Sequence, residues 1–184
     1  MLLQPLELQH IPELTRIALA HPREFALTST PTSERASEAY FAKALKTMNA
    51  NEAHVFAMLT PDAQIIGTTR YTDIDWHNKN CELGYTWFDP QHFGSAVNVE
   101  SKLLLLRHLF EELEFLRVQI NVDTRNERSQ HAIRALGAQF EGTLRSHKFS
   151  KDGYRRDTHV FSIIAADWAE VKVGLESRLA KKRN

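Results

Sequence analysis

Apolar and polar residues follow two different periods along the first half of the chain. Residues 8–20 carry apolar side chains at helical spacing, and Pro12 falls where the first turn of a helix tolerates it. A loop rich in Pro, Ser and Thr follows at residues 21–32, and Ser33 starts a second predicted helix that ends near Met48. Two helices are therefore expected before the meander described next.

The pattern then changes to that of strands. Residues 54–60, 64–74 and 81–88 have the composition of strands, and polar turns at residues 61–62 and 77–80 separate them. Connections this short join antiparallel neighbours. The sequence therefore predicts an antiparallel meander of three strands.

A long helix and a further strand complete the centre of the predicted fold. The segment from about Val97 to Leu113 is apolar nearly all round, which indicates a helix packed on a sheet. Residues 117–123 alternate between apolar and polar side chains, as a strand does. Because a helix separates this strand from strand 81–88, we expect the two strands to pair in parallel.

The last third of the chain adds a short helix, a hairpin and a terminal helix. We expect a Thr124-x-x-Glu127 capping box to open the helix at residues 126–136 and Gly137 to close it. Strands at residues 139–149 and 154–164 flank an Asp152-Gly153 hairpin turn. Asp167 is expected to cap a helix over residues 167–181, and the basic residues 181–183 to form a frayed, solvated tail.

Together these elements predict one α/β (α+β) domain over residues 1–184, with its core at about residues 8–166. Its sheet is expected to be mixed, twisted and mostly antiparallel, with helices flanking it and one parallel pair at its centre. No internal repeat, low-complexity segment or linker interrupts the chain.

Composition excludes several other classes of protein. A hydrophobic fraction of 42% and a charged fraction of 25% are ordinary for a globular chain. The 23 basic and 23 acidic residues balance, which argues against a nucleic-acid binder that works through overall charge. The single cysteine, Cys81, cannot form an intramolecular disulfide, which fits a cytoplasmic location. No secretory signal or membrane-spanning apolar run is visible.

The nine histidines do not have metal-ligand spacing, and neither an HExxH nor a G-x-S-x-G motif occurs. We therefore expect no metal cofactor and no serine hydrolase. Cys81 shows no activating neighbour and is interpreted as a small residue of a half-buried strand.

The loop Phe93–Asn98 is the strongest candidate for a binding site. The N–H groups of a first helical turn have no intrahelical partner, and the helix dipole favours an anion there. Gly94 and Ala96 are small enough for a phosphate to approach the backbone closely. A tight strand-to-helix turn would use the same small residues, so this alternative stays open.

The order of these elements resembles the GNAT (Gcn5-related) N-acetyltransferase fold over roughly residues 8–166. Six short motifs resemble the RimJ/RimL branch of that family: Ile65-Ile66-Gly67, Glu82-Leu83-Gly84-Tyr85, Phe93-Gly94-Ser95-Ala96, Arg125-Asn126-x-x-Ser129, Leu136-Gly137-Ala138 and Glu141-Gly142. The resemblance implies transfer of an acetyl group from acetyl-CoA to a primary amine. The amine would attack directly in a ternary complex, and it would belong to a protein or peptide N-terminus or to a small molecule.

The family's phosphate loop, Q/R-x-x-G-x-G/A, fits this sequence in two registers. Gln91-x-x-Gly94-x-Ala96 matches literally, but the expected helix start favours a register with Phe93 first, Ala96 at the central glycine and Asn98 last. The residues that the resemblance assigns to acetyl-CoA are Trp87, Phe88, Phe93, Gly94, Ser95, Ala96, Val97, Asn98, Arg125 and Asn126. Trp87 and Phe88 would act through the backbone, and Arg125 through its charge, although an exposed helix arginine is also common.

The resemblance also suggests catalytic residues. Glu82 is the expected general base, with a cross-strand or solvated surface carboxylate as the alternative. The position of the family's tyrosine acid holds Ile133, so Ser129, one turn earlier, is the candidate partner of the leaving thiolate, or else a helix-surface serine. Asn126 would contact the pantetheine arm, or simply occupy a helix start, where Asn is favoured.

Aromatic residues are candidates for the acceptor site: Phe25, Trp76 and Tyr85, with His77 beside them. Core packing explains each of them equally well. Two other functions remain open at this level, namely a non-catalytic acyl-CoA-binding sensor or scaffold, and a nucleic-acid-associated module that uses basic residues between 125 and 156. No DNA or membrane partner is expected, and a homo-oligomer is possible.

Overall fold

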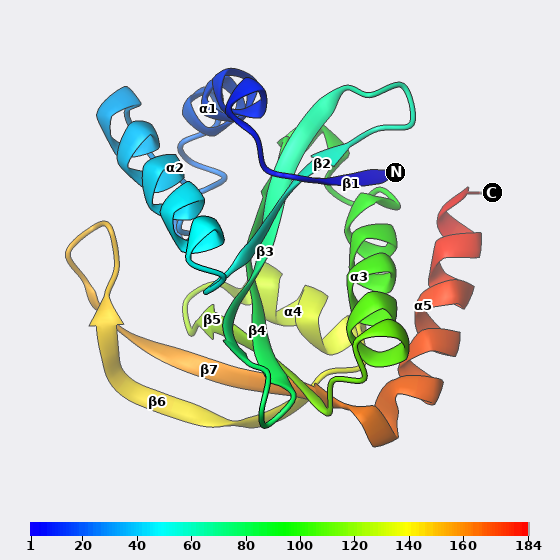
Figure 1. Ribbon diagram of the computed structural model, residues 1–184. Coiled ribbons are helices and arrows are strands. Elements are labelled where there is room, and N and C mark those ends of the chain that lie inside the picture. The colour runs from blue at the N-terminus through cyan, green and yellow to red at the C-terminus, as the bar shows by residue number, and fades with distance from the viewer. Residues whose placement is uncertain (184) are drawn as a thin grey trace. The chain divides into compact units, whose positions relative to one another are not determined.

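The computed structural model describes residues 1–183 (Figure 1). Seven strands form one mixed sheet, in the order β1 (Leu2–Pro5), β2 (His54–Leu59), β3 (Ile65–Asp75), β4 (Asn80–Phe88), β5 (Arg117–Asp123), β7 (Arg155–Ile164) and β6 (Gln139–Phe149). β4 and β5 pair in parallel, as expected, whereas β1–β2, β2–β3, β5–β7 and β6–β7 are antiparallel. The predicted fold class is confirmed.

The chain divides into two compact units, each described by itself below. Residues 1–74 and 83–94 form the first unit, and residues 75–82 together with the chain from Ser95 onward form the second. β4 therefore contributes residues to both. The expectation of a single domain over the whole chain stays a prediction.

The first unit combines helices α1 (Ile11–Ala20) and α2 (Glu34–Asn49) with β1, β2 and most of β3 (Figure 1). Pro12 lies in the first turn of α1, and the Ser33 hydroxyl accepts the N–H of Ala36 at the start of α2, both as predicted. Apolar side chains of both helices and of the neighbouring strands build the core of this unit: Leu6, Leu14, Ile17, Ala18, Phe25, Phe41, Ala44, Ala53, Val55 and Trp87.

β1 is a strand that the sequence pattern missed. It pairs with β2, with Leu2 opposite Leu59, and it lies at the edge of the sheet, where Pro5 is tolerated. A strand of four residues is too short to show a period, and it forms because β2 offers it a partner.

β3 and β4 approach each other closely at Gly67, within the first unit. A Cβ added to Gly67 would lie 2.4 Å from the Cβ of Phe88 and 2.4 Å from the carbonyl oxygen of Trp87. Beside this contact, the N–H of Asp89 donates to the carbonyl of Ile66 at 2.8 Å. Only glycine fits at position 67 without a shift of one strand.

The second unit is built on α3 (Val97–Arg107), which continues into a π-helical turn at His108–Glu112. Val99, Leu103, Leu105 and Leu106 are buried, so the predicted packed helix is confirmed. Helix α5 (Trp168–Arg183) lies beside α3 in Figure 1. The Trp168 ring stacks on Phe110 with centroids 5.3 Å apart, and its indole N–H donates to Glu111 at 2.8 Å.

Two predicted helix ends are wrong. Helix α4 (Glu127–Ala135) is capped by Asn126, whose side-chain oxygen accepts the N–H of Ser129 at 3.1 Å, and not by a Thr124–Glu127 box. At the other end of the unit, α5 runs to Arg183, which forms an ion pair with Glu100 at 2.9 Å. Residues 181–183 are therefore helical, and partners fixed their conformation where the local sequence could not.

The β6–β7 hairpin forms at the predicted turn, where Gly153 adopts a φ of +77° and the N–H of Ser150 donates to the carbonyl of Tyr154. An ion pair between Arg117 of β5 and Glu141 of β6 crosses the intervening strand β7. The Arg117 hydrogen bonds lower the pKa of Glu141 from 4.5 to about 2.

We expect Gly67→Ala to destabilise the protein by about 1–3 kcal/mol, because the added methyl group overpacks a rigid backbone contact. The matched control is Gly174→Ala in α5, where no atom lies within 4 Å of an added Cβ. An alanine there should stabilise the helix by about 0.5–1 kcal/mol. Urea unfolding measures both variants, and equal stabilities for the two would contradict the proposed strand contact.

The Arg117–Glu141 pair predicts a pH dependence. Because the folded-state pKa of Glu141 is lowered, its contribution to stability is present above pH 4.5 and disappears as the pH falls toward 2. The free energy of unfolding of Glu141→Gln should therefore lie below that of the wild type at pH 6 and converge with it near pH 2. Glu38→Gln, an exposed residue of α2, serves as the control. A constant offset between wild type and Glu141→Gln across this range would refute the assignment.

Candidate active site

Glu82 lies at the last pair of the parallel ladder between β4 and β5. The ladder joins Asn80 to Arg117, Cys81 to Val118 and Glu82 to Gln119. The Nδ2 of Asn121 donates a 2.5 Å hydrogen bond to Oε2 of Glu82, whose side chain is half-buried. This bond holds one carboxylate oxygen on the second unit's central strand pair.

The amide of Asn121 is itself oriented. Its Oδ1 accepts a hydrogen bond from Gln119 Nε2 at 3.3 Å, so Asn121 presents Nδ2 to Glu82. The sequence predicted Glu82 but missed Asn121. The signal was present, because Gln119 and Asn121 occupy the polar face of the alternating strand and the parallel register sets Gln119 opposite Glu82.

The neighbouring Cys81 is 3% exposed. Burial, and secondarily the charge of Glu82, raises the pKa of its thiol to about 12. The thiol is therefore protonated at neutral pH and is a poor nucleophile, which agrees with its interpretation as a packed strand residue.

The start of α3 lies where the sequence predicted it. Ala96 immediately precedes the helix with φ −70° and ψ −20°, and the Ser95 hydroxyl oxygen accepts the N–H of Val97 at 3.2 Å. The N–H of Glu100 bonds to the carbonyl of Ala96, whereas helical geometry gives the N–H groups of Asn98 and Val99 no intrahelical acceptor. These two donors are oriented to meet an anion.

Gly94 adopts a φ of +76°, and no heavy atom lies within 4 Å of the place where a Cβ would stand. The glycine is thus required by the backbone twist, and there is room beside it. Preceding it, Phe93 contacts the Phe88 ring edge-on, with centroids 5.5 Å apart. Trp87 is 3% exposed, so only its backbone could meet a ligand, as the sequence analysis expected.

Three residues around α4 have mixed outcomes. Asn126 is 7% exposed and serves as the helix cap, and Ser129 is half-buried in the first turn. Ile133, at the position of the family's tyrosine, is buried and apolar. Ser129 is the candidate that stays open for contact with a leaving group.

Arg125 is committed to partners of its own unit. Its guanidinium pairs with Asp123 at 2.8 Å and with Asp152 at 3.0 Å, and it lies over the Tyr154 ring at 4.1 Å. Burial raises the pKa of Asp123, but the Arg125 hydrogen bonds outweigh it and the net shift is downward. A role for Arg125 at CoA phosphates would have to compete with this cluster.

The predicted acceptor residues differ in exposure. Phe25 is 1% exposed and packs on Trp87 at 5.8 Å, so it is a core residue of the first unit. Tyr85 is 38% exposed, has a backbone φ of +52° and lies in the same unit. Trp76 is 47% exposed, belongs to the second unit and contacts Phe115 there. The sequence missed Arg70, a charged residue inside an otherwise apolar and Thr-rich strand segment, and that contrast was the available signal.

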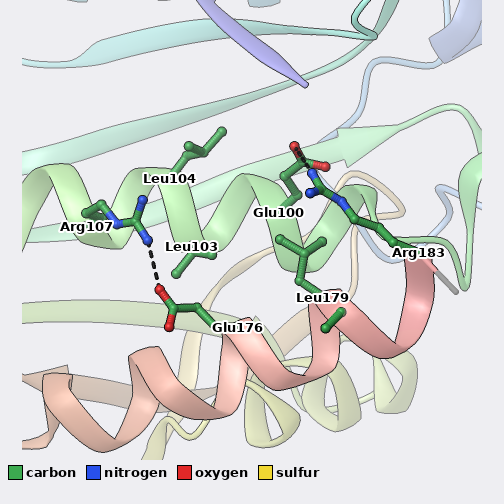
Figure 2. Close-up of a pocket in the computed structure, with 8 residues that line it drawn as sticks. Glu100, Leu103, Leu104, Arg107, Glu176, Leu179 and Arg183 are labelled. Carbon is green, nitrogen blue, oxygen red and sulfur yellow. Dashed lines mark hydrogen bonds and ion pairs between the residues drawn. The ribbon is translucent and has the colours of Figure 1, made fainter.

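A groove of about 360 Å³ runs between α3 and α5, and ion pairs Arg107–Glu176 and Arg183–Glu100 cross it (Figure 2). Its lining consists of Glu100, Leu103, Leu104, Arg107, Glu176, Leu179, Ala180 and Arg183. None of the predicted site residues is among them, so this groove is not the candidate active site.

Within residues 1–183, no three His, Cys, Asp or Glu side chains gather as a metal site would require. In the same range, no helix is both long and apolar enough to cross a bilayer.

The second unit thus contains a helical crossover between parallel strands, with an oriented carboxylate on one strand and free donors at the helix start. Such a crossover is the β-helix-β unit by which an α/β protein joins parallel strands. Residues 1–139 match the family model described as an acetyltransferase (GNAT) domain, and the chain belongs to this family.

Relatives and solved structures agree with this membership. The Escherichia coli (strain K12) ribosomal-protein-serine acetyltransferase is 28% identical over 97 residues, which are 53% of this chain and 54% of the relative. The match thus spans about half the length of that curated relative. An acetyltransferase-family structure from T. thermophilus is 37% identical with a TM-score of 0.84, and the match covers 96% of this chain and 92% of that one.

A third comparison shows the fold alone. The structure of Mycobacterium smegmatis RimJ in complex with CoA-disulfide is 16% identical, with a TM-score of 0.81 over 98% of this chain and 88% of that one.

The cap of α4 can be tested separately from any ligand. Asn126→Ala should lower the free energy of unfolding by about 1 kcal/mol, because the Ser129 N–H loses its acceptor. Asn126→Asp keeps an acceptor oxygen and should retain most of that stability. Chemical denaturation measures both, and equal losses in the two variants would argue against capping as the role of the side-chain oxygen.

Proposed function

We propose that the protein is an acetyl-CoA-dependent N-acetyltransferase that acylates a primary amine by direct attack in a ternary complex. The observation that carries this proposal is the Glu82 carboxylate, held by Asn121 at the end of the parallel strand pair of a GNAT family member. The hydrogen bond fixes the orientation of the carboxylate, which supports a role as a positioned base.

The start of α3 fits the phosphates of CoA. The N–H groups of Asn98 and Val99 and the positive end of the helix dipole favour an anion, and Ser95 and Ala96 are small. Acetyl-CoA would supply the activated acetyl group as a thioester. Asn126 would hydrogen-bond its amide-containing arm. The expected cofactor roles of Trp87, Phe88, Phe93 and Gly94 stay predictions, and the partners of Arg125 make its role the weakest of the set.

Glu82 would take the proton that the attacking amine must lose. An amine arrives protonated at neutral pH, and only the neutral form attacks a carbonyl carbon. A positioned general base contributes about 10²–10⁴-fold to such a step. The half-buried Ser129 would hydrogen-bond the departing sulfur, because Ile133 offers no polar group.

The acceptor is proposed only as a primary amine. The curated relative named for a ribosomal protein supports a protein or peptide N-terminus, and the small-amine alternative stays open. A homo-oligomer and a cytoplasmic location also stay predictions. The nucleic-acid reading loses support because Arg125, Arg134 and Arg155 are engaged with acidic or aromatic side chains.

We expect Glu82→Gln to lower kcat by about 10²–10⁴-fold, with an unchanged Kd for acetyl-CoA and an unchanged melting temperature. The glutamine can still accept the Asn121 hydrogen bond but cannot take a proton. Thiol release with a panel of amines measures turnover, and calorimetric titration with acetyl-CoA and desulfo-CoA measures binding.

The control for this experiment is Glu176→Gln, a surface residue of α5 whose turnover should match the wild type. If Glu82→Gln also turns over normally, Glu82 is not the base. Binding of acetyl-CoA by the wild type without turnover of any amine would favour the non-catalytic acyl-CoA-binding alternative. Absence of binding at millimolar acetyl-CoA would refute the proposal of an acetyl-CoA-dependent enzyme.

A further inference from the structure

Arg70 is a buried cation in the first unit. Arg70 lies on strand β3 and is 5% exposed. Its guanidinium carbon lies 4.6 Å from the ring centre of Tyr40 and 4.5 Å from that of Tyr85. Two aromatic rings therefore contact the guanidinium with their faces. Such cation–π contacts stabilise the charge but satisfy none of its N–H donors.

Two hydrogen-bond donors of Arg70 lack an acceptor in the described chain. Nε and Nη2 are both buried, and neither has a hydrogen-bond partner within residues 1–183. These two nitrogens form one edge of the planar guanidinium, the edge that binds a carboxylate through two parallel hydrogen bonds. Buried polar groups are almost always paired, so two unpaired donors on one edge call for an external acceptor.

A third donor lies on the same face of the strand. The Oγ1 of Thr72 is also buried without a hydrogen-bond partner in the described chain. Residues i and i+2 of a strand point to the same face, about 6.6 Å apart. Arg70 and Thr72 thus offer donors in a row along β3, all within the first unit.

The two rings set the shape of what fits. Because both ring centres lie within 4.6 Å of the guanidinium carbon, an acceptor is favoured at the free Nε–Nη2 edge, in the plane of the guanidinium. A carboxylate is planar, and its two oxygens match that edge in a single plane. The Tyr40 hydroxyl is fixed by the Trp87 indole N–H at 3.2 Å, while Tyr85 is 38% exposed. Tyr85 is therefore the ring that can move to admit a ligand.

From this arrangement we infer that Arg70, with Thr72, binds the carboxylate of the acceptor, so that the acetylated amine belongs to the class of amino acids or acidic peptides. This inference rests on the proposed function, because the ligand is taken to be the amine that the enzyme acetylates. It also assigns a specific role to Tyr85, an expected acceptor residue, whose ring would move to admit the carboxylate to Arg70.

Matched acceptors test the inference through thiol release from acetyl-CoA. L-amino acids are compared with their carboxamides, and peptide amides with Asp at the second position with those that carry Asn. O-phosphoethanolamine supplies the phosphate arm. We expect Arg70→Met to lower kcat/KM for the preferred carboxylate acceptor by about a hundredfold and to change that for its uncharged counterpart less than about threefold.

Two further variants complete the design. Arg70→Lys keeps the charge without the two-donor edge and should recover only part of the preference. Arg16→Met, at an exposed arginine of α1 paired with Glu13, should behave as the wild type. Arg70→Met should melt no lower than the wild type, because it removes a buried charge whose donors are unpaired.

Each outcome decides the question. An equal loss with charged and uncharged acceptors means that Arg70 has a structural role, and a preference for O-phosphoethanolamine means a phosphate site; either overturns the inference. Equal use of acids and amides by the wild type also overturns it, because the Arg70 edge would then hold only internal water. The amino acid and peptide arms show which source of carboxylate is bound.

Failure of the proposed function is distinguishable from failure of this inference. If acetyl-CoA does not bind and no amine is acetylated, the enzyme proposal fails by itself. The melting temperature with each amino acid or acidic peptide amide alone, set against its uncharged counterpart, then decides the anion site. A rise in melting temperature with any of the acids that is lost in Arg70→Met supports the anion site, and the absence of such a rise overturns it.

Discussion

The short parallel ladder between β4 and β5 is the constraint on which the candidate chemistry depends. Two strands can be parallel neighbours only when a long crossover joins them, and here α3 is part of that crossover. The ladder sets Glu82 opposite Gln119, and two residues further along β5 Asn121 reaches the Glu82 carboxylate. The same crossover supplies the helix start that a phosphate needs. One topological requirement thus produces both halves of the proposed site of the second unit.

The sequence predicted the elements whose signals are local and periodic. The packed helix that starts at Val97 and the Ser33 cap are examples. The helix shows as a long apolar segment, and the cap bonds an N–H only three residues away. Prediction failed where a distant partner decides. β1 needs β2, and the helical end at Arg183 has an ion pair with Glu100. The cap of α4 is a local case. Several polar residues near that helix start could serve as the cap, and the backbone conformation places Asn126 there in place of the expected box.

The site shows the same division. Glu82 could be named because a strand position and a family resemblance coincide, but its orientation by Asn121 depends on a register that one sequence does not state. Phe25 was expected at the acceptor and is instead core, since aromatic residues serve both purposes equally well. Arg125 pairs with Asp123 two residues away and with Asp152, which only the folded β6–β7 turn brings to it. Residue type alone cannot separate such alternatives.

Two buried cations of this protein show why burial by itself is not a functional signal. Lys102 on α3 is 6% exposed, and burial lowers its pKa to about 7, so this side chain can reduce the cost of burial by losing its proton. An arginine cannot follow that route, because the guanidinium keeps its charge in proteins. Arg70 therefore needs acceptors for its donors, and Tyr40 and Tyr85 provide only their ring faces. Sequences break local rules where function requires it. A charged residue in a buried strand, beside a tyrosine whose backbone is left-handed, breaks two of them at one place.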